Sequence, residues 1–111
     1  MKVQFNLGLN NNNFNRYQSQ ILIENVFDAY KAGKYSMRYE MGEFIGSDEP
    51  TLVGEFVIGS NVDVKAIFRA LADIFTQECI AIKIDGIGSL EFRNDYTGER
   101  YQFDEKYFIN Y

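Results

Sequence analysis

Histidine is absent from the sequence, and cysteine occurs only once, as Cys79. Without histidine, Ser-His-Asp triads, histidine general bases and histidine-ligated metals are excluded. A single cysteine forms neither an internal disulfide nor a cysteine zinc site, so a secreted disulfide scaffold is also excluded. Because Cys79 has apolar neighbours, we interpret it as a small core residue rather than as a reactive thiol.

Long apolar runs and phosphate-binding motifs are also missing. No stretch is long enough to cross a bilayer and the first residues lack a signal-peptide pattern, so we expect a cytoplasmic protein without a membrane partner. There is no Walker A or G-x-G-x-x-G motif, because Gly86 and Gly88 lie in a predicted hairpin. The net charge of −5 argues against direct nucleic-acid binding, which requires clustered lysine and arginine.

Aromatic side chains are abundant, with ten phenylalanines and eight tyrosines but no tryptophan. Each buried ring stabilises a core by about 1.5–3 kcal/mol, so a folded chain is expected rather than a disordered one. A length of 111 residues fits one domain, which we place at residues 1–111. Aromatic and arginine residues alternate between Phe92 and Phe103, and we interpret this stretch as packing because three acids dilute its charge.

Hydrophobic periodicity predicts the order of helices and strands. Alternation with period two predicts strands at 2–9, 35–45, 51–58, 79–84 and 87–93, and helical spacing predicts helices at 16–32 and 64–75. Asn15 and Gln18 have the spacing of a capping box, and Asp85-Gly86 is typical of a type I′ hairpin. A turn at 46–50, a short strand at 100–103, and a helical turn or docked aromatic tail at 104–111 complete the prediction.

This order is β-α-β-β-α-β with an added C-terminal hairpin, which predicts an α+β protein of the ferredoxin-like, split βαβ type. Right-handed crossovers place both helices on one face of an antiparallel sheet. The opposite face is less apolar, so we expect it to be the surface for a partner or, alternatively, for a homodimer.

Negative charge is concentrated in one part of the chain. Between Tyr39 and Val64 there are six carboxylates and no lysine or arginine, whereas the other residues carry ten acids and eleven bases. A solvated edge is the commonest explanation of such a run, a surface for a basic partner is the second, and a metal or catalytic pair is the third. The six residues are Glu40, Glu43, Asp48, Glu49, Glu55 and Asp63.

The sequence contains five short motifs, at Gly8-Leu9-Asn10, Glu49-Pro50-Thr51-Leu52-Val53, Gln77-Glu78-Cys79-Ile80-Ala81, Phe103 and Tyr107-Phe108. They resemble those of small uncharacterised α+β proteins of phages and mobile elements. They span most of the chain, and an abundance of Asn, Ile, Phe, Tyr and Lys is typical of AT-rich genomes of this kind. The resemblance implies one compact domain and a mobile-element origin.

We therefore expect a non-catalytic binding protein without cofactor or metal. Its six carboxylates would occupy a basic surface of a host defence protein, as anti-CRISPR and anti-restriction proteins do. One alternative is a protein that sequesters a nucleotide signal at the start of the first helix, where free N–H groups favour anions. A Mg²⁺-dependent enzyme is the other alternative. The nucleotide site would use Asn11, Asn12, Asn13 and Asn15.

Overall fold

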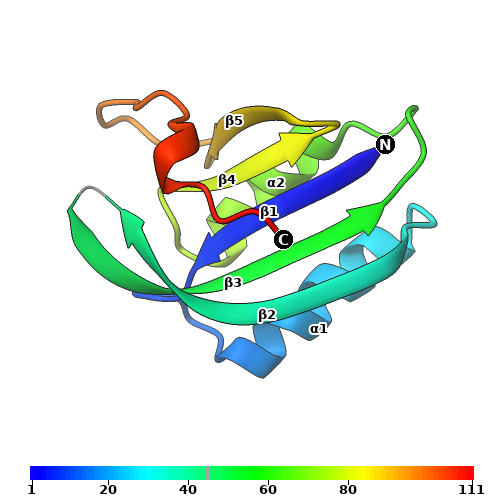
Figure 1. Ribbon diagram of the computed structural model, residues 1–111, viewed down its shortest axis with the longest axis horizontal. Helices are drawn as coiled ribbons and strands as arrows, with labels where there is room; N and C mark the ends of the chain where they lie inside the picture. The colour runs from blue at the N-terminus through cyan, green and yellow to red at the C-terminus, as the bar shows by residue number, and fades with distance from the viewer. Residues whose placement is uncertain (45) are drawn as a thin grey trace.

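A five-stranded antiparallel sheet forms the centre of the computed structural model, which describes residues 1–44 and 46–111 (Figure 1). Two α-helices and one 3₁₀ turn complete the described part of the chain, which confirms the predicted α+β class. None of these described helices is long and apolar enough to cross a membrane. The elements are β1 (Lys2–Gly8), α1 (Arg16–Asp28), β2 (Gly33–Phe44), β3 (Ser47–Val57), α2 (Val64–Ile74), β4 (Cys79–Ile84), β5 (Ile87–Phe92) and η1 (Glu105–Tyr107).

The strands lie in the order β2-β3-β1-β4-β5. Because β3 is antiparallel to both of its neighbours, β1 and β2 run in the same direction on either side of it. Strand β1 separates β3 from β4 in the same way. Both helices lie behind the sheet in Figure 1, whereas the end of the chain crosses in front of it.

Phenylalanine rings fill the space between the helices and the sheet. Phe5, Phe27, Phe56 and Phe68 are fully buried, and the Phe27 ring lies 4.4 Å from Phe56 and 5.1 Å from Phe68, centroid to centroid. These rings come from β1, α1, β3 and α2, so one aromatic cluster joins both helices to the central strands. Such pairs contribute about 0.5–1.5 kcal/mol beyond the burial of their area.

Helix α1 begins as predicted but ends earlier. Asn15 accepts a hydrogen bond from the Gln18 backbone and Gln18 reciprocates, which confirms the capping box. The predicted end at residue 32 is wrong, because the helix stops at Asp28 and Lys31 adopts a positive φ of 63°. The N–H of Ala32 bonds back to the carbonyl of Phe27, so the chain turns directly into β2.

The hairpin between β2 and β3 is longer than the sequence predicts. The turn predicted at 46–50 is wrong, because Ser47 already pairs with Phe44 and Pro50 pairs with Met41. The carbonyl of Pro50 accepts from Leu9, so Pro50 turns its backbone polar groups toward the β1 side of β3. Its nitrogen lies past the end of β1, where no strand needs a donor, and proline is therefore tolerated there. Ile45, the last residue of the predicted second strand, lies outside the described residues.

The C-terminal segment, residues 101–111, covers the sheet face opposite the helices (Figure 1). The strand predicted at 100–103 is wrong, because these residues pair with no strand. The side chain of Asn6 exchanges two hydrogen bonds with the backbone of Ile109, at 2.9 and 2.8 Å. Lys83, only 7% exposed, donates to Glu105 and Asn110. Over β1 and β4, the face expected to be open is therefore occupied by the chain itself.

Replacing Gly54 tests the close approach of β3 to the core. An added Cβ at Gly54 would lie 2.4 Å from the Phe5 ring, whereas one at Gly33 would meet no atom within 4 Å. We expect Gly54→Ala to lower the free energy of unfolding in urea by about 1–3 kcal/mol, because the core is overpacked. Gly33→Ala is the control, and equal stability of the two variants would contradict this packing.

Replacing Lys83 tests how the C-terminal segment is held. We expect Lys83→Ala to lower the free energy of unfolding by about 1–3 kcal/mol, because charge-assisted hydrogen bonds to Glu105 and Asn110 are lost. Trypsin should also cleave faster after Lys106, which mass spectrometry would follow. Lys65→Ala, at an exposed position on α2, is the control. Unchanged cleavage in Lys83→Ala would show that Lys83 does not hold the segment.

Candidate functional site

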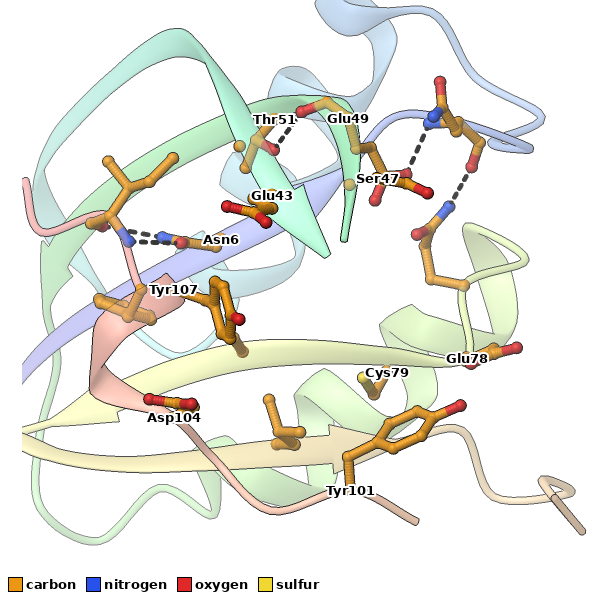
Figure 2. A pocket seen from close by; sticks show the side chains of 18 of the residues that line it. Asn6, Glu43, Ser47, Glu49, Thr51, Glu78, Cys79, Tyr101, Asp104 and Tyr107 are labelled. Atoms are coloured by element: carbon orange, nitrogen blue, oxygen red, sulfur yellow. Dashed lines mark hydrogen bonds between the residues drawn. The ribbon is translucent and has the colours of Figure 1, made fainter. Parts of the chain in front are cut away.

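A cleft of about 680 Å³ lies on the sheet face opposite the helices, between the end of the β2–β3 hairpin and the C-terminal segment (Figure 2). Its volume falls within the range of about 300–1,000 Å³ that is usual for ligand sites. Residues from all five strands, from the loop after β1, from the connection before β4 and from the C-terminal segment line it. The cleft therefore exists only in the folded chain.

Small side chains form the floor of the cleft. Gly8, Gly42 and Ala81 line it from β1, β2 and β4. A Cβ at Gly8 would lie 2.5 Å from the carboxyl of Glu49, and one at Gly42 would lie 2.5 Å from the Thr51 hydroxyl. Any larger residue at Gly8 or Gly42 would displace Glu49 or Thr51, so the shape of the cleft depends on both glycines.

The lining of the cleft carries negative charge only. Among the described residues that line it there are five carboxylates and no lysine or arginine. Three of the acids come from the β2–β3 hairpin, one precedes β4 and one belongs to the C-terminal segment. A concave surface with charge of one sign concentrates the electric field and attracts ions of the opposite sign. The five are Glu43, Asp48, Glu49, Glu78 and Asp104.

Aromatic rings of the C-terminal segment form the opposite wall. Phe108 is 7% exposed, and the Phe103 ring lies 5.4 Å from it, centroid to centroid, where it packs over Gly88. These two rings anchor the wall. Tyr107 is 39% exposed and Tyr101 is 36% exposed, so two tyrosines lie where the cleft meets solvent.

Glu49 is half-buried, whereas Glu43 and Asp48 are exposed. The Glu49 carboxylate accepts the backbone N–H of Asn10 at 3.0 Å. Burial raises the pKa of Glu49, and this hydrogen bond opposes the rise only in part. Ionised Glu49 is therefore held in the folded protein at some cost in stability.

The one thiol of the chain, Cys79, is poorly suited to nucleophilic chemistry. Cys79 lines the cleft at the start of β4 and is only half-buried, so it is not the core residue that the sequence suggests. Burial, with a smaller contribution from nearby carboxylates, raises the pKa of its thiol to about 12, so the nucleophilic thiolate is scarce near neutral pH. Within residues 1–44 and 46–111, no group of three or more acids or cysteines is placed to hold a metal ion.

The structure divides the six carboxylates predicted to bind a partner. Glu43, Asp48 and Glu49 are brought together at the cleft. The other three interact within the chain. Glu40 pairs with Arg38, Glu55 lies 3.5 Å from the Lys2 ammonium, and Asp63 caps α2 through the N–H of Ala66.

The sequence did not identify Glu78, Asp104 or the tyrosines as part of this site. Glu78 lies between the predicted helix at 64–75 and the predicted strand at 79–84, and Asp104 begins the segment predicted as a helical turn or docked aromatic tail. No local pattern links positions 78 and 104 to positions 43–49, because only the pairing of β1 with β3 and β4 and the docking of the C-terminal segment bring them together.

Asparagines proposed for a nucleotide site lie at the start of α1, where two of them bond within the chain. Asn12 accepts from Phe14 and donates to Ser19, and Asn15 is occupied in the capping box. Asn13 is exposed, and Asn11, with a positive φ of 60°, borders the acidic cleft.

Glu49→Gln tests the pKa argument. Because the folded state raises the pKa of Glu49, it binds more protons than the unfolded state between the two pKa values, so wild-type stability falls as pH rises through that window. Glutamine does not ionise. We expect Glu49→Gln to be more stable than wild type at about pH 7 and equal to it at about pH 4 or below. Urea unfolding at both pH values measures this, and an equal offset at both would contradict it.

Comparisons with known proteins provide no evidence on the function of this site. No family model, no curated protein and no solved structure matches this chain. The resemblance to small phage and mobile-element proteins therefore stays a prediction from the sequence.

Proposed function

We propose that the protein is a non-catalytic binding protein whose acidic cleft engages a positively charged surface of another protein. The observation that carries this proposal is the lining of the cleft, in which five carboxylates stand together without a lysine or arginine. Glu43 and Asp48 lie exposed on paired positions near the end of the β2–β3 hairpin, where a partner can reach them. Complementary charge at such a rim speeds association and fixes orientation.

The partner class that fits best is a protein whose basic surface normally binds nucleic acid. Carboxylates spaced along a hairpin can take the place of phosphates on such a surface. This fit, together with an amino-acid composition typical of AT-rich genomes, favours an inhibitor from a phage or mobile element that acts in the cytoplasm on a host defence protein. Nucleotide binding is less well supported, because Asn12 and Asn15 already bond within the chain and Asn11 borders an acidic cleft that repels phosphate groups.

We also propose that the fold has the ferredoxin-like, split βαβ topology. Strands β1 and β2 flank β3, strands β3 and β4 flank β1, and one helix connects each pair. In this assignment β5 is an added edge strand that extends the sheet through the β4–β5 hairpin. Both turn residues of that hairpin, Asp85 and Gly86, have positive φ, as a type I′ turn requires.

Charge reversal tests the proposed function. We expect the wild-type protein to inhibit DNA cleavage by at least one member of a panel of RNA-guided nucleases and restriction endonucleases. Glu43→Lys combined with Asp48→Lys should weaken that inhibition by about 100-fold or more, because like charges then face each other across the interface. The control, Asp73→Lys with Glu99→Lys, changes the net charge equally but lies outside the cleft.

The control variant should inhibit as the wild type does. Equal loss in both double variants would mean that net charge, and not the cleft, determines binding. Absence of inhibition across the panel would contradict the proposed partner class.

A further inference from the structure

We infer that the cleft seats an arginine side chain of the partner, with its guanidinium between Glu43 and Tyr107. This inference rests on the proposed function, because it specifies which positively charged group enters the cleft. Both residues line the cleft, Glu43 from β2 and Tyr107 from the C-terminal segment. In Figure 2, Glu43 lies beside the β2–β3 hairpin and Tyr107 lies on the C-terminal segment.

The chain already holds one of its own arginines in this kind of setting. The guanidinium of Arg38 pairs with Glu40 at 2.5 Å, and its Cζ lies 4.7 Å from the centroid of the Tyr111 ring. As at the proposed seat, the carboxylate comes from β2 and the tyrosine from the C-terminal segment. Glu43 lies further along β2 than Glu40, and Tyr107 lies earlier in the C-terminal segment than Tyr111. Both line the cleft, whose described lining contains no arginine.

The charges at the proposed seat are not neutralised within the described chain. No lysine or arginine of residues 1–44 or 46–111 forms an ion pair with Glu43, Asp48 or Glu78. Tyr107 already takes part in a cation–π contact, because Lys106 Nζ lies 5.1 Å from its centroid, although Lys106 does not line the cleft. The ring is thus placed where a cation can approach it.

Arginine fits this lining better than lysine does. A guanidinium is planar, is less strongly hydrated than an ammonium, stacks on aromatic rings and bonds a carboxylate through two parallel N–H groups. Its alkyl stem can lie along apolar surface. Ala81 and Leu90 provide such surface in the cleft. The volume of about 680 Å³ leaves room for the backbone that carries the side chain.

Titration with amino-acid derivatives tests the inference without the partner protein. The ¹⁵N-labelled protein would be titrated with the N-acetyl amides of arginine, lysine and citrulline, the last being a neutral isostere of arginine. We expect arginine to give saturable shifts at the amides of Gly42, Glu43, Ala81 and Tyr107. Lysine should bind at least about threefold more weakly, and citrulline should give no saturable shift. Equal affinities for arginine and lysine, or shifts scattered over the surface, would overturn the inference.

A pair of tyrosine variants tests the role of the ring. Tyr107→Leu keeps an apolar side chain but removes the π-face, and we expect about a fivefold loss of arginine affinity with an otherwise unchanged spectrum. The matched control is Tyr17→Leu, on the exposed side of α1, which should bind arginine as the wild type does. Unchanged affinity in Tyr107→Leu would overturn the inference.

The two proposals fail in different ways. If nuclease inhibition depends on Glu43 and Asp48 but the arginine derivative does not bind the cleft, the proposed function stands and the arginine seat is wrong. If the derivative binds the cleft as described while no member of the panel is inhibited, the seat stands and the nuclease partner is wrong.

Discussion

The buried ammonium of Lys83 is the constraint that holds the C-terminal segment on the sheet face opposite the helices. Lys83 points away from the helices, where it is only 7% exposed. A cation withdrawn from water in this way needs compensating partners, because an unpaired buried charge is strongly destabilising. Glu105 and Asn110 provide them, so the end of the chain is fixed across β4 and β1. The aromatic wall of the cleft follows from this docking.

Ion pairs within the sheet determine which carboxylates of the hairpin stay unpaired. Arg38 and Lys2 lie beside Glu40 and Glu55, in the part of the sheet where β2, β3 and β1 are all present. Beyond residue 8, β1 has ended and the β2–β3 hairpin continues without it. No basic residue pairs with the acids of this extension within the described chain. The extension therefore keeps its negative charge, whereas Glu40 and Glu55 are paired with Arg38 and Lys2.

Local signals in the sequence predicted the elements well, whereas the site depends on long-range contacts. The capping box at Asn15 and the turn at Asp85-Gly86 were predictable because each involves residues within three positions of one another. Pro50 was misleading, since proline usually marks a turn, and its tolerance inside β3 follows only from where β1 ends. The contributions of Glu78 and Asp104 depend on strand order and on the docking of residues 101–111, which no local pattern encodes.

The acidic lining of the cleft disfavours contact with neutral and acidic surfaces as well as favouring contact with basic ones. Exposed carboxylates such as Glu43 and Asp48 are stable in water, because water solvates them fully. A partner that covers them without supplying a cation leaves them desolvated and unpaired, which costs several kcal/mol. Arg38 shows within the same protein how one guanidinium can satisfy a carboxylate and a tyrosine together. Under the proposed function, neutral and acidic surfaces are thus excluded by the free energy of burying unpaired charge, in addition to the attraction of basic ones.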